Sequence, residues 1–368
     1  MRFFTARKDF LKALQISQKA IGNSSQLPVL GNFLIETEGQ NLKISATNLE
    51  FSVICKTTAE IKNEGKITIP AKILTNWLNF QKDEEIELKV LEGETVEIKT
   101  KTSQTKIKGI PADEFPELPG VQKAEEISLT AENLSQSISE VAFSCAHSAI
   151  RPVLSGVLLF SKGKNLNFAA TDSYRLAEKK VELEKEPKSE IYSIVPARTM
   201  IELERILSGL ENSEEIKIQI SKNQISFSAG KIQIISRLIE GKFPDYQQII
   251  PTEKKTIISV DKEDFSLAIK RVGIFAKENN NNISISTEKD LIKITTKETE
   301  VGGEISEVAA KITGEKNEVF LNGQFILDVL NVLKSDEIKI TINEKISPAI
   351  FSGKDSENFT YVVMPLKN

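Results

Sequence analysis

The chain has 368 residues, which is too long for one ordinary domain. Its residues are 40% hydrophobic and 27% charged, a composition typical of globular proteins, which excludes long disordered arms. No stretch approaches the roughly 20 consecutive apolar residues that span a bilayer, and the opening MRFFTARKDF has no apolar signal core. The net charge of −4 does not exclude nucleic acid as a partner, because an acidic protein can still gather Lys and Arg on one surface.

Residues suited to catalysis are scarce. The chain has one histidine, His147, which we interpret as a helix-end residue, and two cysteines, Cys55 and Cys145, without a metal-ligand spacing. No glycine-rich phosphate loop is present. We therefore expect neither an enzyme nor a cofactor, and two isolated cysteines favour a reducing cytosol.

The first third of the chain predicts a mixture of strands and two helices. Arg2–Ala6 is expected to form a strand, and 8–21 an amphipathic helix with Phe10 and Leu14 on its apolar face. A second helix is expected to follow Pro70, a residue type that suits the start of a helix, and to bury Ile73, Leu74, Trp77 and Leu78. Alternating apolar residues predict strands at 32–39, 41–48, 51–61, 85–93 and 95–102, with a turn at Gly93 and another at Gly163.

Short sequences recur about 125 residues apart. PVL at 28–30 returns at 152–154, and NL at 41–42 returns at 165–166, both with a shift of 124. A fainter third copy is indicated by Glu-Ile pairs that open an alternating strand at 85, 215 and 337. We therefore predict three similar α+β domains at residues 1–120, 127–250 and 251–368, with linkers at 120–126 and 251–255.

The whole chain resembles the bacterial sliding clamps, the β subunits of the replicative DNA polymerase. The matching motifs are LPVLGNFLIE (27–36), AATDSYRLA (169–177), IVPARTMIEL (194–203), EGKFPDY (240–246), FILDVLNVL (325–333) and YVVMPL (361–366). The resemblance implies a DNA clamp fold with antiparallel sheets outside and two helices per domain inside. It also implies a head-to-tail homodimeric ring that slides on duplex DNA without sequence specificity and confers processivity.

The family also implies a groove that binds short linear peptides containing Gln and hydrophobic residues. Its expected partners are the polymerase III catalytic subunit, the clamp loader, other polymerases and repair proteins. Two departures favour a change in peptide preference: the common Gly-His is Ser173-Tyr174 here, and Gln247-Gln248 stands where Arg often follows FPDY. The residues that carry over by motif are Leu154, Thr171, Ser173, Tyr174, Arg175, Leu176, Pro244, Gln248, Ile249, Val362, Val363, Met364, Pro365 and Leu366.

Two further surfaces follow from the resemblance. The dimer seam is expected to join Thr105 and Ile107 of one copy to Ile274 and Phe275 of the other. The helix at 132–147 has no Lys or Arg, and positions 23–26 (Asn-Ser-Ser-Gln) lack the family's basic residue. We therefore expect that the inner surface of the ring, which faces DNA, is not uniformly basic. The cations expected to face DNA phosphates are Lys8, Lys12, Lys19, Lys72, Arg198, Arg205, Lys270, Arg271 and Lys277.

Two other classes of protein stay open at this point. One is an enzyme that uses a carboxylate or lysine site on a scaffold built from repeats. The other is a monomeric adaptor that binds peptides but never encircles DNA. The mass in solution separates the adaptor from the clamp, because a stable dimer has twice the 40.9 kDa of one chain.

Overall fold

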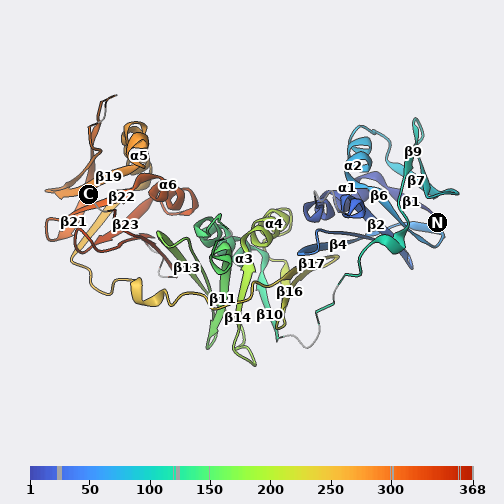
Figure 1. Cartoon of the computed structure of the whole chain (residues 1–368), viewed down its shortest axis with the longest axis horizontal. Coiled ribbons are helices and arrows are strands. Elements are labelled where there is room, and N and C mark those ends of the chain that lie inside the picture. The colour runs from blue at the N-terminus through green and yellow to red at the C-terminus, as the bar shows by residue number, and fades with distance from the viewer. Residues whose placement is uncertain are drawn as a thin grey trace. The chain divides into compact units, whose positions relative to one another are not determined.

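The computed structural model describes residues 1–22, 27–118, 120–121, 125–148, 150–298, 300, 302–354, 356 and 358–366 (Figure 1). They form two compact units, one of residues 1–132 and 205–238, the other of residues 133–204 and 239–368. Positions 23–26, where the sequence lacks the family's basic residue, lie outside the described residues.

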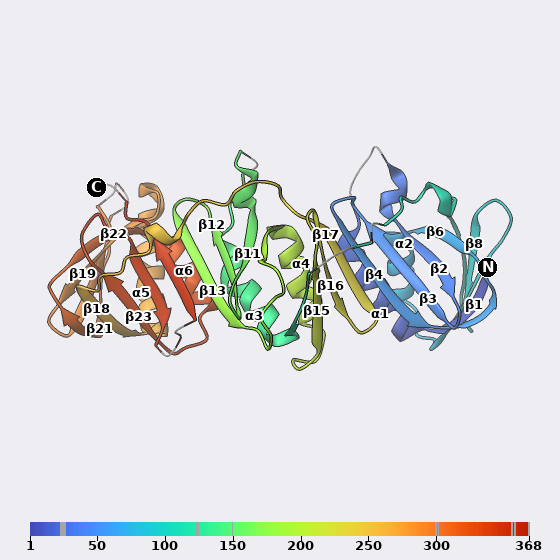
Figure 2. The same ribbon diagram turned by 90° about the horizontal axis from the view of Figure 1, so that it is seen from below.

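Unit 1 contains two antiparallel sheets and two complete helices, α1 (Arg7–Ser17) and α2 (Ala71–Asn79). The five-stranded sheet has the order β5 (Glu60–Asn63), β1 (Arg2–Ala6), β7 (Glu85–Val90), β8 (Thr95–Lys99) and β9 (Gln104–Lys108). The eight-stranded sheet has the order β10 (Glu125–Thr130), β15 (Glu215–Ile220), β16 (Gln224–Ala229), β17 (Ile232–Arg237), β4 (Phe51–Thr58), β3 (Asn41–Thr47), β2 (Asn32–Glu38) and β6 (Lys66–Pro70). Figure 2 shows β4, β3 and β2 side by side.

Unit 2 contains one long antiparallel sheet, together with α5 (Lys262–Ala276), α6 (Gly323–Val332) and most of α3 (Ala131–Val141) and α4 (Ala197–Leu207). The order of its strands is β14 (Tyr192–Pro196), β11 (Gly156–Lys162), β12 (Asn165–Thr171), β13 (Arg175–Glu182), β25 (Phe359–Val363), β24 (Ala349–Gly353), β23 (Glu337–Ile342), β18 (Thr256–Asp261), β21 (Ile305–Gly314), β20 (Leu291–Thr295), β19 (Asn282–Glu288) and β22 (Glu318–Asn322).

The three repeats predicted from the sequence are visible in the order of elements. Each begins with a strand followed directly by a helix: β1 and α1, β10 and α3, β18 and α5. The three Glu-Ile pairs open β7, β15 and β23, as predicted. Both PVL sequences form short 3-10 turns, Pro28–Gly31 and Pro152–Ser155. The structure has two compact units where the sequence predicts three domains, because the strands of the central repeat are divided between two sheets. Four of them (β10, β15, β16 and β17) belong to the eight-stranded sheet, and β11 to β14 belong to the long sheet of unit 2.

The predicted turns are confirmed at both glycines. Gly93 has φ +61° and Gly163 has φ +59°, a left-handed conformation that a residue without a Cβ adopts at little cost. The first predicted linker ends too late, because residues 125 and 126 already belong to β10. Pro70 closes β6, and α2 begins directly after it at Ala71, as expected.

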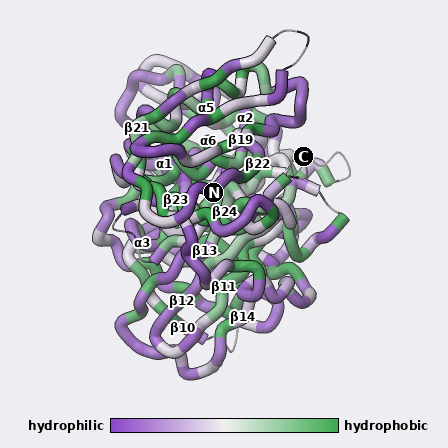
Figure 3. The backbone as a smooth tube through the Cα atoms, turned by 90° about the vertical axis from the view of Figure 1, so that its left-hand side faces the viewer, coloured by the Kyte–Doolittle hydropathy of each residue, from purple (hydrophilic) through white to green (hydrophobic). Residues whose placement is uncertain are grey.

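Burial alternates along the strands and follows one face of each helix. Phe10 and Leu14 of α1 are fully buried, as predicted. The prediction for α2 is partly wrong: Leu74 and Leu78 are buried, but Ile73 is 56% exposed. Helical periodicity identifies an apolar stripe but not its width, so a residue at its margin can lie outside the core. Figure 3 shows hydrophilic and hydrophobic stretches alternating along the chain, and no helix among the described residues is long and apolar enough to cross a membrane.

Candidate peptide-binding site

Four neighbouring strands of unit 2 carry a row of side chains across one face of their sheet. Thr171 on β12 pairs with Leu176 on β13, Leu176 pairs with Val362 on β25, and Val362 pairs with Ile350 on β24. Directly opposed residues of antiparallel strands point to the same side of a sheet. We call this side the outer face; the opposite side, which packs against α6, is the helix face.

An apolar cluster is built around this row. It contains Leu154, Leu158, Ala169, Leu176, Ile194, Phe243, Tyr246 and Val362, all buried, and we call these residues the outer-face cluster. Leu154, Leu176 and Val362 were predicted from the sequence, and the structure brings them together. The other five were not named, although Phe243 and Tyr246 lie inside the EGKFPDY motif and Ala169 inside AATDSYRLA.

Exposed residues lie next to the outer-face cluster. Tyr174 is 63% exposed and Ile249 is 39% exposed, while Ser173, Pro244 and Gln248 are exposed as well. We call these five residues the rim. A buried apolar floor with an exposed, mixed rim is the arrangement that holds short peptides through hydrophobic anchors.

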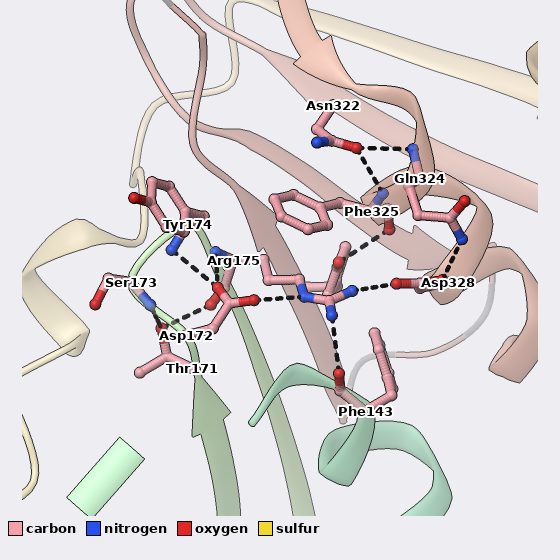
Figure 4. A network of polar contacts seen from close by, with 11 residues as sticks. Phe143, Thr171, Asp172, Ser173, Tyr174, Arg175, Asn322, Gln324, Phe325 and Asp328 are labelled. Carbon is pink, nitrogen blue, oxygen red and sulfur yellow. Dashed lines mark hydrogen bonds and ion pairs between the residues drawn. The ribbon is translucent and has the colours of Figure 1, made fainter. Parts of the chain in front are cut away.

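The turn between β12 and β13 is fixed by its own polar groups. The Thr171 hydroxyl donates to the Arg175 carbonyl at 2.6 Å and accepts from the Ser173 amide at 3.1 Å. Asp172 Oδ1 accepts from the amides of Tyr174 and Arg175 at 2.9 and 3.0 Å (Figure 4). Ser173 has φ +80°, which costs energy for a residue that carries a Cβ.

The last described residues are held beside this turn. The Met364 amide donates to the Tyr174 carbonyl at 2.9 Å, and the Leu366 amide donates to the Phe320 carbonyl at 2.8 Å. Met364, Pro365 and Leu366 are half-buried. The predicted C-terminal residues therefore lie next to Tyr174, where they extend the rim.

Tyr246 fixes the segment that carries the other side of the rim. Its hydroxyl donates to the carboxylate of Glu178, a buried residue of β13. Burial raises the pKa of Tyr246, and the hydrogen bond to Glu178 raises it further. The Phe243 amide donates to the Tyr192 hydroxyl at 2.8 Å. These contacts position Pro244, Gln248 and Ile249 beside the cluster.

Two of the predicted residues do not lie on the outer face. Arg175 and Val363 are directly opposed on β13 and β25, and both point to the helix face. Strand alternation explains the difference, because neighbours of Leu176 and Val362 in sequence must point the other way. These two residues were predicted to line the groove, and the structure places them behind its floor.

The Arg175 side chain is held by several groups on the helix face (Figure 4). Its Nε donates to Asp172 Oδ2 at 3.0 Å, its Nη1 to the Asp328 carboxylate and its Nη2 to the Phe143 carbonyl at 3.0 Å. The guanidinium also lies 4.5 Å from the centre of the Phe325 ring. Through its bond to Asp172, Arg175 supports the turn under Tyr174. Phe325 and Asp328 lie inside the FILDVLNVL motif, but neither was named as a site residue from the sequence.

The nine cations predicted to face DNA are all exposed. Arg271 is engaged by two groups: its Nε is 3.3 Å from the Ser306 hydroxyl and 4.0 Å from a Glu304 carboxylate oxygen. The other eight are Lys8, Lys12, Lys19, Lys72, Arg198, Arg205, Lys270 and Lys277, and Arg205 also has an interaction within the chain.

The four residues predicted for a dimer seam differ in exposure. Ile274 on α5 is 66% exposed, and Phe275 is half-buried. Thr105 and Ile107 belong to β9, an edge strand of its sheet, with Thr105 half-buried and Ile107 only 5% exposed. A β9 edge offers backbone groups for pairing, but the Ile107 side chain is already committed to the core of its own chain.

Family models for all three domains of the DNA polymerase III beta subunit match the chain. The N-terminal domain matches residues 1–119, the central domain residues 128–245 and the C-terminal domain residues 247–367. The chain belongs to the DNA polymerase III β-subunit family. It is a DNA sliding clamp, and the family is non-catalytic.

Relatives and solved structures agree over the full length. The beta sliding clamp of Salmonella typhimurium is 30% identical over 371 residues, covering 100% of both chains, and that of Synechococcus elongatus is 29% identical over 373 residues, covering 100% of this chain and 99% of the relative. The Bacillus subtilis sliding clamp structure has a TM-score of 0.95 at 25% identity, covering 100% of this chain and 99% of its own. The Pseudomonas aeruginosa clamp bound to griselimycin has a TM-score of 0.96 at 28% identity, covering 100% of both chains.

Proposed function

We propose that two copies of this chain close head to tail into a ring around duplex DNA and tether the replicative polymerase through the outer-face cluster and its rim. The observation that carries the tethering role is the row Thr171–Leu176–Val362–Ile350 on the outer face. This row lies beside the exposed rim and the half-buried C-terminal residues. The polymerase III catalytic subunit, the clamp loader and repair proteins would each present a short peptide to this same surface.

The chemistry of the cluster favours a peptide with apolar anchors. Leu154, Leu176 and Val362 offer an apolar floor, and the half-buried Met364 offers a flexible thioether that adapts to different side chains. Exposed Gln248 offers an amide that can pair with a Gln of the peptide. Such a surface tolerates several partners, which suits a tether shared by different enzymes.

A titration with a labelled peptide containing Gln and hydrophobic residues tests this site. Ile249→Ser removes an exposed apolar rim residue and is expected to weaken binding about ten-fold, which corresponds to ~1.4 kcal/mol. Ile73→Ser, at a 56% exposed isoleucine on α2 of unit 1, is the matched control and should bind normally. Equal affinities for both variants would reject the site. We also expect griselimycin to compete with the peptide, as its binding to the P. aeruginosa relative suggests.

Contacts with duplex DNA are proposed to be phosphate-directed. The exposed lysines of α1 and α2 and the exposed cations of α4 and α5 support this role, since such contacts weaken with salt and carry no sequence information. Arg271 is less suited than the lysines because Glu304 and Ser306 already engage it.

Ring closure is proposed to use β9 of one copy and the end of α5 of the other. The exposed Ile274 supports this, as does Ile305, which is 62% exposed at the start of β21. Sedimentation of the full chain should give twice 40.9 kDa, and Ile274→Lys should give one chain mass. A single-chain mass for the unaltered protein would favour the monomeric adaptor.

Location in the cytoplasm is part of the same proposal. Cys55 and Cys145 are both free and buried, which suits a reducing compartment. No metal or cofactor is required by the proposed mechanism. Among the described residues, no group of three or more His, Cys, Asp or Glu side chains is arranged to hold a metal ion.

A further inference from the structure

The two complete helices of unit 1, α1 and α2, lie side by side (Figure 1). They are joined by a hydrogen bond from Gln15 Nε2 on α1 to Asn79 Oδ1 on α2, at 3.5 Å. On α1, Lys8, Lys12 and Gln15 are exposed and spaced by four and three residues, which places them on one side of the helix. Lys19 continues the same spacing beyond the helix end.

Next to this lysine stripe, α2 exposes large apolar side chains that the core does not use. Ile73 is 56% exposed, and Phe80, directly after the last helical residue, is 86% exposed. Residues seven apart on a helix point in nearly the same direction, so Ile73 and Phe80 lie on one side of α2. Lys72 is exposed beside them, and Trp77, one turn after Ile73, is half-buried.

The lysines of this surface are available to an anion. None of Lys8, Lys12, Lys19 and Lys72 forms an ion pair with another described residue. Asp9, in the first turn of α1, is an acidic neighbour. We call Lys8, Lys12, Lys19, Lys72, Ile73 and Phe80 the α1–α2 face. It combines free cations with an exposed aromatic ring and an aliphatic side chain.

We propose that the α1–α2 face binds single-stranded DNA, with its lysines on the phosphates and with Phe80 and Ile73 against unpaired bases. An exposed aromatic ring beside a basic stripe is the combination that holds single strands, because every base has a face that can stack. Duplex DNA offers the same phosphates, but its bases are already stacked inside the helix. Sliding on a duplex therefore uses the lysines and gives no role to Phe80.

The inference goes beyond ring closure and polymerase tethering. A clamp that slides along DNA reaches junctions where the duplex ends and a single strand begins. At such a junction, the α1–α2 face would hold the unpaired nucleotides while the other exposed cations hold the duplex. This would give the clamp a preference for junctions over uninterrupted duplex.

Fluorescence anisotropy with the full chain at low salt tests the proposal. The probes are a labelled oligothymidylate and an abasic oligomer of the same length, which has the phosphates without the bases. The intact chain should bind the oligothymidylate at least about five-fold more tightly than the abasic oligomer, as expected for one stacked base. Phe80→Ser should remove this preference and leave binding of the abasic oligomer unchanged.

Two further variants separate the contributions. Lys12→Glu combined with Lys72→Glu should weaken binding of both oligomers, while Ile346→Ser, also at a highly exposed isoleucine, should change neither. Equal affinity of the intact chain for both oligomers, or an unchanged preference in Phe80→Ser, would overturn the proposal. So would a loss of the dimer in Phe80→Ser by sedimentation, because Phe80 would then be covered by a second copy. Retention on circular DNA does not depend on any of these outcomes. If the single-strand proposal fails, the proposal that two copies form a ring around DNA is therefore unaffected.

Discussion

The guanidinium of Arg175, at the start of β13, binds the carboxylate of Asp328 on α6, 153 residues later in the chain. Arg175 is 7% exposed and also binds Asp172 and the Phe143 carbonyl. One buried side chain therefore joins the turn that carries Tyr174 to a helix of the C-terminal repeat. The rim of the candidate peptide site depends on this connection.

Arg175→Ala is expected to lower the stability of unit 2 strongly. The change leaves two carboxylates without their cation, and breaking a buried pair in this way costs about 3 kcal/mol or more. Urea unfolding measures the effect. Lys345→Ala is the matched control: its pair with Glu318 is exposed on both sides and should contribute less than about 1 kcal/mol. Similar losses in both variants would contradict the role given to Arg175.

Ser173→Gly is expected to stabilise the protein. Ser173 has φ +80°, where glycine avoids a steric cost of about 1–2 kcal/mol, although glycine's greater freedom in the unfolded chain returns part of that gain. A net increase of about 0.5–1 kcal/mol should appear in urea unfolding. Ser352→Gly, in the strand β24, should instead be destabilising. A loss of stability in Ser173→Gly would show that the serine side chain contributes more than its backbone costs.

Tyr246→Phe tests the hydrogen bond to Glu178 and its dependence on pH. At neutral pH the loss should be about 1–3 kcal/mol, because a buried carboxylate loses its donor. The pKa of Tyr246 is raised in the folded protein by burial and then by Glu178, so this contribution is complete below the ordinary value of 10.0. It declines as the pH rises above that value.

The difference in unfolding free energy between the intact chain and Tyr246→Phe isolates this group, since all other groups titrate in both. The difference should be constant below pH 10.0 and shrink above it. A difference that grows with alkaline pH would contradict the raised pKa.

The departures at Tyr174 and Gln248 predict an altered peptide preference. Peptides optimised for other bacterial clamps should bind this chain several-fold more weakly, because a larger, uncharged rim replaces the usual His and Arg. Tyr174→His combined with Gln248→Arg should recover most of the affinity in a direct titration. Equal affinities for the intact chain and a relative would reject the hypothesis.

Much of the fold could be predicted because the same short sequence patterns recur in more than one domain. The Glu-Ile pairs, the PVL turns and the glycines at 93 and 163 each occur where the structure has the expected element. These features depend on short-range chemistry, such as alternation and left-handed turns, which a sequence displays directly.

The parts that could not be predicted depend on neighbours far apart in sequence. Motif matching named Arg175 and Leu176 together, but strand alternation sends them to opposite faces. Asp328, the partner of Arg175, lies in the FILDVLNVL motif, 153 residues later in the chain, and no local pattern connects the two. Ile73 was expected in the core, and its exposure became evident only when the position of α2 was known.

Retention on circular and linear duplex DNA after loading, at moderate salt, tests the central claim most directly. A ring that encircles DNA should stay on circles and leave quickly once the circle is cut, because its retention is topological. Equal loss from circles and linear duplexes would contradict encirclement and leave surface binding or a peptide adaptor as the explanation.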